Sequence, residues 1–172
     1  MNHAYLLTGG NLGDRAENLK MAERAIEKSA GKIVAISSLY ETAAWGTTDQ
    51  PDYLNQAILI ETDMEAQELL STLLSIEIQL GRFRQEKYGP RPIDIDILFF
   101  NSEIIKTSTL TVPHPHIQNR RFVLVPMAEI APDFEHPLFG KNITALLTNC
   151  PDPLDVKKFY SPTGIKQVDL PG

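Results

Sequence analysis

The architecture of this chain is clearest at Ile93-Asp94-Ile95-Asp96-Ile97-Leu98-Phe99-Phe100. In the first half of this stretch, three isoleucines alternate with two aspartates, and a period of two is typical of a β-strand. Successive residues of a strand point to opposite faces, so the isoleucines would share one face and both carboxylates the other. The sequence therefore predicts a strand over 93–100 with an apolar face and an acidic face.

Five further elements precede this strand. Apolar runs over 4–8, 32–40 and 53–61 predict strands. Apolar residues at helical spacing predict one helix from about 15 to 30 and another over 65–80. The resulting order is strand, helix, strand, strand, helix, strand. This split βαβ order predicts an α+β domain with one antiparallel sheet and helices on one face.

The chain beyond residue 100 shows weaker patterns. We expect a small hairpin near 103–105, and Pro113 and Pro115 forbid a helix over 111–119. A helix or turn and helix is expected over 121–130, interrupted at Pro126, and a short helix over 142–150. No repeat or linker divides the 172 residues. We therefore predict a single domain over 1–172, in which residues 151–172 form an unassigned C-terminal extension.

The composition argues against several classes of protein. Lys and Arg number 16 and Asp and Glu number 22, which gives a net charge of −6, whereas a general nucleic-acid binder usually has a basic surface. The single cysteine, Cys150, cannot form an intrachain disulfide, which favours a reducing compartment. Neither a signal peptide nor a membrane-spanning apolar run is apparent. We expect a cytoplasmic protein that binds neither membrane nor nucleic acid.

Asp94 and Asp96 are the first candidates for a functional site. Two neighbouring carboxylates repel each other unless a cation lies between them, and magnesium takes one or two carboxylates together with phosphate oxygens. Metal on one side and guanidinium groups on the other suit phosphoryl transfer. The alternatives are a solvated acidic edge or a structural pair with arginine. The basic residues of the segment before the strand are Arg82, Arg84, Lys87 and Arg91.

His114 is a second candidate. It lies between Pro113 and Pro115 on a segment that cannot be helical, and Arg120 and Arg121 follow it closely. In this setting the imidazole could meet a phosphate group, although a lone histidine more often has a structural role.

Tyr53 and Asn55 would share one face of a strand. An aromatic ring and a carboxamide suit a flat heteroaromatic ligand, because they provide stacking and paired hydrogen bonds. Phe122 could add a second stacking face. The alternative is that both aromatic rings belong to the core. The sequence contains no Walker phosphate-binding loop and no Ser/His/Asp or Cys/His hydrolytic set.

Seven segments, taken in order, resemble one family, 6-hydroxymethyl-7,8-dihydropterin pyrophosphokinase. The most specific is Tyr88-Gly89-Pro90-Arg91-Pro92-Ile93-Asp94-Ile95-Asp96-Ile97. The others are Gly9-Gly10-Asn11-Leu12-Gly13-Asp14, Ser37-Ser38-Leu39-Tyr40-Glu41-Thr42, Gln50-Pro51-Asp52-Tyr53-Leu54-Asn55, Gly81-Arg82-Phe83-Arg84, Leu110-Thr111-Val112-Pro113-His114-Pro115 and Arg120-Arg121-Phe122-Val123-Leu124-Val125-Pro126. The resemblance extends from about Ala4 to Pro132.

The resemblance implies a ferredoxin-like fold and an enzyme that moves diphosphate from ATP to a hydroxymethyl dihydropterin, releasing AMP. It implies two magnesium ions on Asp94 and Asp96, and catalytic roles for these residues with Arg82 and Arg91. Arg82 and Arg84 would lie on a loop that closes over the reactants. The residues expected around ATP are Glu77, Arg84, Tyr88, Arg91, Ile97, Thr111, His114 and Arg120. Those expected around the pterin are Thr42, Ala43, Trp45, Tyr53, Asn55 and Phe122.

Some positions depart from the family pattern. Gly10 stands where the family often has serine, Tyr88 replaces a tryptophan, and Thr109 and Pro115 replace an arginine and a tyrosine of some members near ATP. The enzyme is expected to be a monomer with small-molecule substrates. An alternative from another class is a noncatalytic ferredoxin-like module that binds nucleotide or RNA on its sheet.

Overall fold

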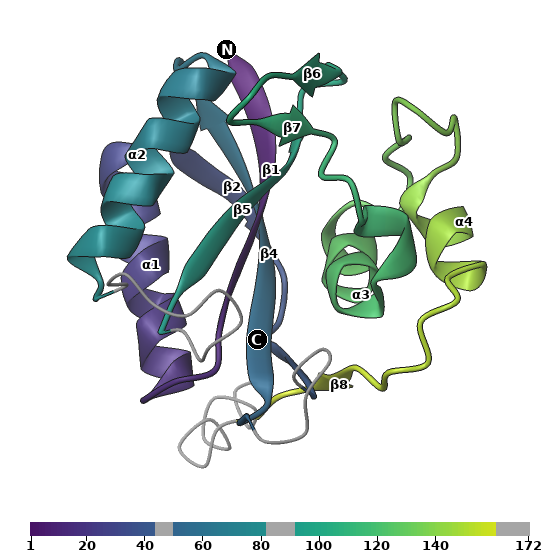
Figure 1. The fold of residues 1–172 in the computed structure, drawn as a ribbon, viewed down its shortest axis with the longest axis horizontal. Helices are drawn as coiled ribbons and strands as arrows, with labels where there is room; N and C mark the ends of the chain where they lie inside the picture. Colours follow the sequence, from purple (N-terminus) through teal and green to yellow (C-terminus); the bar gives the residue numbers. More distant parts are fainter. Residues whose placement is uncertain (44–49, 82–91, 161–172) are drawn as a thin grey trace.

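The computed structural model of the chain describes residues 1–43, 50–81 and 92–160. A six-stranded sheet lies between two layers of helices (Figure 1). Its strands are β1 (Asn2–Gly10), β2 (Lys32–Ile36), β3 (Tyr40–Thr42), β4 (Tyr53–Thr62), β5 (Asp94–Phe100) and β8 (Lys157–Lys158). The helices are α1 (Arg15–Ser29), α2 (Ala66–Gln79), α3 (Arg121–Ile130) and α4 (Ile143–Thr148).

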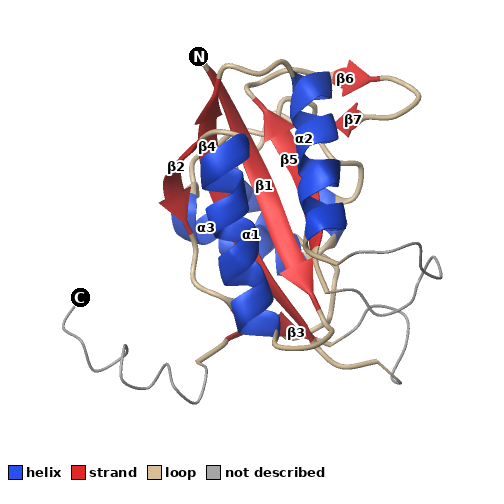
Figure 2. Ribbon diagram, turned by 90° about the vertical axis from the view of Figure 1, so that its left-hand side faces the viewer, coloured by secondary structure: helices blue, strands red, loops and turns tan. Residues whose placement is uncertain are grey.

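The sheet has the strand order β5-β1-β4-β3-β8, and β2 also pairs with β4. Every pairing within it is antiparallel. Helix α1 follows β1, helix α2 follows β4, and both lie against the same face of the sheet (Figure 2). The order β1, α1, β2, β4, α2, β5 confirms the predicted α+β, ferredoxin-like arrangement.

The strand predicted over 32–40 is divided into β2 and β3, which both pair with β4. Ser37 lies at the division, and its hydroxyl accepts the backbone N–H of Ala57 at 2.9 Å. The Ser37 hydroxyl thus replaces a backbone carbonyl as the acceptor for Ala57. This substitution interrupts the backbone ladder between β2 and β3.

The prediction of helices on one face holds for α1 and α2 but is wrong for the whole chain, because α3 and α4 cover the opposite face (Figure 1). Two hydrophobic cores result. The core under α1 and α2 includes Leu6, Ile58 and Ile95. The core under α3 and α4 includes Leu7 and Leu98. Burial of both sheet faces explains why β1 and β4 are apolar on both sides.

The predicted interruption at Pro126 is also wrong, because α3 continues through this residue. Proline lacks an N–H, so the carbonyl of Phe122 loses its usual helical partner, at a cost of about 3 kcal/mol. Pro126 is itself buried together with Val123, Leu124 and Met127. Burial of this apolar face against the sheet offsets the missing hydrogen bond.

A β-bulge at Leu98 interrupts the alternation of β5. Tyr5 pairs with Phe99 and Leu6 with Ile97, so Leu98 has no partner of its own in the register. Leu98 and Phe99 consequently both enter the core under α3, and Phe100 returns to the core under α1 and α2. Asp94 and Asp96 precede the bulge and alternate in step with Leu98, so both lie on the face that α3 covers.

The later elements are short. Strands β6 (Ile105–Lys106) and β7 (Thr111–Val112) form a separate hairpin, slightly later in the chain than predicted. A 3-10 helix spans Ile117–Asn119, within the segment expected to be irregular. In the C-terminal extension, β8 pairs with β3 at the edge of the main sheet.

Candidate functional site

The strand register aligns the candidate residues in one row across the sheet. Asp94 on β5 pairs with Gly9 on β1, Gly9 pairs with Asn55 on β4, and Asn55 pairs with Tyr40 on β3. Directly paired residues lie on the same face of a sheet. Asp94 and Asn55, far apart in the sequence, are therefore only two strands apart, a separation of roughly 10 Å at normal strand spacing.

Gly9 leaves room at the centre of this row for the Asn55 side chain. A Cβ atom at Gly9 would collide with the carboxamide oxygen of Asn55 and would lie 3.1 Å from the carbonyl oxygen of Leu54. The Asn55 side chain therefore lies over Gly9, in space that any other residue would fill. The glycine is required here for close approach rather than for an unusual backbone angle.

Glu77 holds the strand that carries the two aspartates. Its side chain is only 3% exposed, and its Oε2 accepts the backbone N–H of Ile95 at 2.6 Å. Because β5 is an edge strand, this outward-pointing N–H has no neighbouring strand to bond, and α2 supplies the acceptor instead. Glu77 thus contacts the residue between Asp94 and Asp96, and its expected place beside ATP stays a prediction.

The aspartates fit a magnesium site in the chemistry of their donors. Asp96 is exposed, Asp94 is half-buried, and both project from the same face of β5. Within residues 1–43, 50–81 and 92–160, no group of three or more His, Cys, Asp or Glu side chains could hold a metal. Two carboxylates are nevertheless a normal protein contribution to magnesium, whose other positions are filled by phosphate oxygens and water.

Asp96, His114, Arg120 and Phe122 form a second group beside the row. The guanidinium of Arg120 lies 5.7 Å from the centre of the Phe122 ring. Burial lowers the pKa of Arg120, while the carboxylates of Asp96 and Asp152 act in the opposite direction. An arginine stays cationic through such a change. The group therefore offers a half-buried positive charge to an anionic ligand.

His114 is neutral in this environment. Burial, together with the nearby Arg120 and His116, lowers the pKa of His114 to about 4. Its backbone N–H donates to the carbonyl of Leu98 at 3.0 Å, and its Nδ1 accepts from the backbone N–H of His116 at 3.4 Å. The neutral ring consequently carries its proton on Nε2, where it can act as a hydrogen-bond donor.

The predicted pterin residues of β3 and β4 lie together. Thr42 pairs with Tyr53, so both side chains share the face that carries Asn55. The Thr42 hydroxyl is buried and has no hydrogen-bond partner within the part of the chain that the structure describes. An orphaned buried hydroxyl costs free energy unless a ligand supplies its partner. Ala43 follows directly and is exposed.

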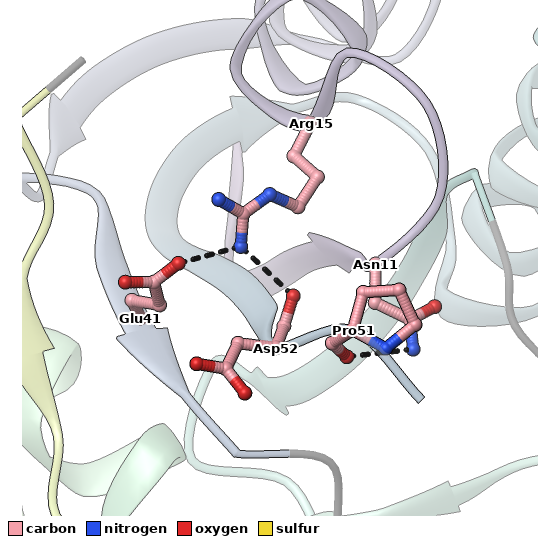
Figure 3. A network of polar contacts seen from close by, with 5 residues as sticks. All are labelled: Asn11, Arg15, Glu41, Pro51 and Asp52. Carbon is pink, nitrogen blue, oxygen red and sulfur yellow. Dashed lines mark hydrogen bonds and ion pairs between the residues drawn. The ribbon is translucent and has the colours of Figure 1, made fainter. Parts of the chain in front are cut away.

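Asn11 and Arg15, for which the sequence predicted no role, bond the residues that come just before Tyr53. Arg15 donates to the carboxylate of Glu41 at 2.7 Å and to the carbonyl of Asp52 at 2.9 Å, as Figure 3 shows. The buried amide of Asn11 donates to the carbonyl of Pro51 at 3.2 Å (Figure 3). These bonds join β1 and α1 to the segment that enters β4. No sequence period marks them, although Asn11 belongs to one of the family-like segments.

A carboxylate also ties α3 to β3. Glu129 accepts from the Tyr40 hydroxyl at 2.6 Å and from the backbone N–H and hydroxyl of Ser38, both at 3.1 Å. Burial acts to raise the pKa of Glu129, but these hydrogen bonds and the charge of Lys158 outweigh it and lower the pKa. Burial, and then the hydrogen bond to Glu129, raise the pKa of Tyr40. Hydrogen bonds to Glu129 therefore connect α3 to β3, the strand that carries Thr42.

The remaining candidates are placed less directly. Ile97 lies in the core under α1 and α2, so a contact from it to a ligand would come from its backbone. Thr111 is exposed on β7, and Thr109 donates to Gln67 of α2 at 3.2 Å. Five predicted site residues lie outside the described part of the chain: Trp45, Arg82, Arg84, Tyr88 and Arg91.

A pocket of about 370 Å³ opens beside the second group. Its lining residues are His116, Asn119, Arg120, Pro151, Asp152 and Pro153. The C-terminal extension therefore contributes to the surroundings of Arg120. None of the helices in the described residues has the length and apolar character needed to cross a membrane.

Comparison with known proteins identifies the family of the chain. The family model for 7,8-dihydro-6-hydroxymethylpterin-pyrophosphokinase matches residues 5–132. A relative from Synechocystis, named 2-amino-4-hydroxy-6-hydroxymethyldihydropteridine pyrophosphokinase, is 44% identical over 140 residues, which cover 81% of this chain and 71% of the relative. A relative of the same name from Bacillus subtilis is 44% identical over 135 residues, covering 78% of this chain and 81% of the relative.

Solved structures show the same fold. The wild-type HPPK-DHPS of Plasmodium falciparum matches with a TM-score of 0.70 and 18% sequence identity, over 86% of this chain and 44% of the solved chain. The present chain thus spans less than half the length of that protein. At this level of identity the likeness concerns the fold alone.

Proposed function

The chain belongs to the 7,8-dihydro-6-hydroxymethylpterin-pyrophosphokinase family, and from this premise we propose that it transfers diphosphate from ATP to 6-hydroxymethyl-7,8-dihydropterin in folate biosynthesis. The products are AMP and the dihydropterin diphosphate. The observation that carries the proposal is the row Asp94–Gly9–Asn55, which aligns a carboxylate suited to metal and phosphate with a carboxamide suited to a heteroaromatic ring.

Asp94 and Asp96 would hold magnesium, with two ions expected. When bound, the metal would neutralise negative charge on the phosphate oxygens of ATP. The contribution of the chain itself is to keep both carboxylates on one face, and the Glu77–Ile95 hydrogen bond supports this. Because the phosphates would complete the coordination of the metal, ATP and magnesium are expected to bind together.

The pterin would bind over the Asn55 end of the row. Tyr53 and Phe122 would stack on the ring, and the Asn55 carboxamide would pair with its polar edge. The buried Thr42 hydroxyl offers a further hydrogen bond on the same face. Ala43 and Trp45 follow in the chain and would complete this side. The hydroxymethyl group would point along the row from the ring site toward Asp94.

ATP would bind on the Asp94 and Asp96 side. Arg120 offers a charge for its phosphates, and the Nε2–H of neutral His114 offers a hydrogen bond. Thr111 and the backbone of Ile97 lie near the same edge strand. Arg82, Arg84, Tyr88 and Arg91, which lie outside the described residues, are proposed for the same substrate from their positions in the family-like segments.

In the reaction, the hydroxymethyl oxygen forms a bond to the β-phosphorus of ATP and loses its proton. The bond between the β-phosphorus and the oxygen that bridges to the α-phosphorus breaks, and this oxygen leaves with AMP. Positioning and charge neutralisation dominate such transfers. Arg82 and Arg91, with the two aspartates, are the proposed catalytic residues. The substrates are small molecules, and we expect a monomer in the cytoplasm without a nucleic-acid partner.

One assay tests the proposal. The protein is incubated with ATP, magnesium and 6-hydroxymethyl-7,8-dihydropterin, and the nucleotide product is identified. AMP that forms in equal amount to the dihydropterin diphosphate supports diphosphate transfer. ADP or inorganic phosphate as the main product would reject it. Binding of single-stranded RNA at moderate salt without AMP formation would instead favour the noncatalytic alternative.

A further inference from the structure

We infer that Asp152, in the C-terminal extension, is a positioning residue for the side of the site formed by Arg120 and Phe122. This inference rests on the proposed function. It concerns a residue that lies beyond the span of 5–132 matched by the family model. It also gives a role to part of the extension that the sequence left unassigned.

Asp152 bonds the backbone at the start of α3. The residue is only 6% exposed, and its Oδ2 accepts the backbone N–H of Arg121 at 3.0 Å. Arg121 is the first residue of α3, and the preceding residue, Arg120, provides no side-chain cap. The first N–H groups of a helix lack partners inside it, and a carboxylate there is stabilising. A residue 31 positions later thus supplies the missing cap.

The capped residue lies between two candidate ligand contacts. Arg120 and Phe122 flank Arg121 in the chain, and the Arg120 guanidinium lies over the Phe122 ring at 5.7 Å. The carboxylates of Asp152 and Asp96 both act to raise the pKa of Arg120, so both favour its charged form. The arrangement repeats that of Glu77, which accepts the N–H of the residue between Asp94 and Asp96. Each side of the site is held through the backbone by a buried carboxylate from another part of the chain.

The neighbours of Asp152 in the chain restrict its position. Pro151 and Pro153 restrict the backbone on both sides, and the Oδ1 atom accepts the N–H of Leu154 at 3.0 Å. The segment then continues into β8, which pairs with β3. After β8, the guanidinium carbon of Arg15 lies over the ring of Phe159, 5.3 Å from the ring centre. The extension is therefore anchored to the sheet on one side and to α3 on the other.

The test compares Asp152→Ala, Asp152→Asn and a matched control, Asp155→Ala. Asp155 lies in the same segment but is exposed, and its ion pair with Lys157 at 3.8 Å is also exposed. For each variant, the Kd for 6-hydroxymethyl-7,8-dihydropterin is measured by calorimetry in the presence of a non-hydrolysable ATP analogue and magnesium. The kcat, the KM for each substrate and the Tm are measured alongside.

Asp152→Ala is expected to raise the Kd and KM for the pterin about tenfold, because a lost charged cap frees the start of α3. The kcat should change less than the KM, since Phe122 contacts the substrate before as well as during the reaction. Asp152→Asn keeps one acceptor oxygen and should lie between Asp152→Ala and the wild type. Asp155→Ala should match the wild type.

The inference is overturned if the folded Asp152 variants bind the pterin within twofold of the wild type. It is equally overturned if their only change is a lower Tm with unchanged KM values, because that result indicates a purely structural role. The near-isosteric Asp152→Asn variant decides the question if Asp152→Ala fails to fold. A wild-type protein that forms no AMP and binds no pterin would reject the proposed function instead.

Discussion

The carboxylate of Glu77 on α2 accepts the backbone N–H of Ile95 on β5 at 2.6 Å. This bond joins the helix to the outer edge of the sheet at the residue between Asp94 and Asp96. Helix α2 therefore both covers the sheet and holds the strand that carries the candidate metal ligands. The relationship leads to the first prediction.

Glu77→Ala should destabilise the protein by about 2 kcal/mol, because it leaves the buried N–H of Ile95 without an acceptor. It should also lower kcat/KM about tenfold, since the aspartates would lose their fixed position. Glu77→Gln keeps an acceptor and should retain more activity. Chemical unfolding and the AMP assay measure the two effects. Glu68→Ala, an exposed change on the same helix, is the control. Equal behaviour of Glu77→Ala and Glu68→Ala would contradict the prediction.

Asp94→Ala and Asp96→Ala should each abolish magnesium-dependent activity while leaving the fold intact. The loss corresponds to several kcal/mol of transition-state stabilisation, which is typical when a metal on phosphoryl oxygens is removed. AMP formation across a magnesium titration and circular dichroism test both parts. Asp63→Ala, in an exposed turn, should behave as the wild type. Full activity in either site variant would remove the metal assignment.

Gly9→Ala should weaken pterin binding and cost about 1–3 kcal/mol of stability, because the new methyl group would collide with the Asn55 carboxamide. The change should be less harmful in an Asn55→Ala background, where that collision is removed. A double-mutant cycle on stability and on pterin Kd measures this coupling. Additive effects of the two changes would show that Asn55 does not lie over Gly9.

Arg15→Ala should weaken pterin binding several-fold and reduce stability by about 1–3 kcal/mol. The substitution removes the hydrogen bonds that hold Glu41 and the carbonyl of Asp52, and so loosens the chain just before Tyr53. Calorimetric binding and urea unfolding provide the measurements. Arg24→Ala serves as the matched control, since the ion pair of Arg24 with Glu17 at 3.9 Å is exposed to solvent. A pterin Kd that Arg15→Ala leaves unchanged would rule out this role.

His114 should make stability depend on pH in a defined direction. Burial, with Arg120 and His116 nearby, lowers its pKa to about 4, whereas an unfolded histidine titrates near 6.5. Between these values the unfolded chain binds the proton and the folded chain does not, so stability is greatest above about 6.5 and falls as the pH drops. His114→Gln should flatten this dependence.

Urea unfolding at pH 5 and pH 7 measures the effect of His114, and imidazole NMR gives its pKa directly. A His114 resonance that titrates near its ordinary value would contradict the prediction.

The local part of the site could be predicted from the sequence. The alternation of isoleucine and aspartate placed both carboxylates on one face of a strand, and the burial of β5 agrees. The shared face of Tyr53 and Asn55 likewise followed from their spacing. Such inferences succeed because strand geometry relates residues i and i+2 directly. The roles proposed for these residues are a further step and stay predictions.

The sequence failed where burial competed with local propensity. Pro126 was expected to interrupt α3, because proline removes a helical hydrogen bond, but the apolar face of the helix packs on the sheet and includes Pro126. The second helical layer was missed for a related reason. Strands that are apolar on both faces require cover on both, yet the sequence alone did not identify α3 and α4 as that cover.

By itself, the sequence determined the order of strands and helices, the acidic face of β5 and, through its family-like segments, the family. Only the tertiary structure decided which backbone groups hold the site: Glu77 on Ile95, Asp152 on Arg121, and the space above Gly9 for Asn55. The physical reason is distance along the chain. Periodic patterns record how neighbouring residues share a face, but a hydrogen bond between distant segments depends on sheet register and packing, which no local period encodes.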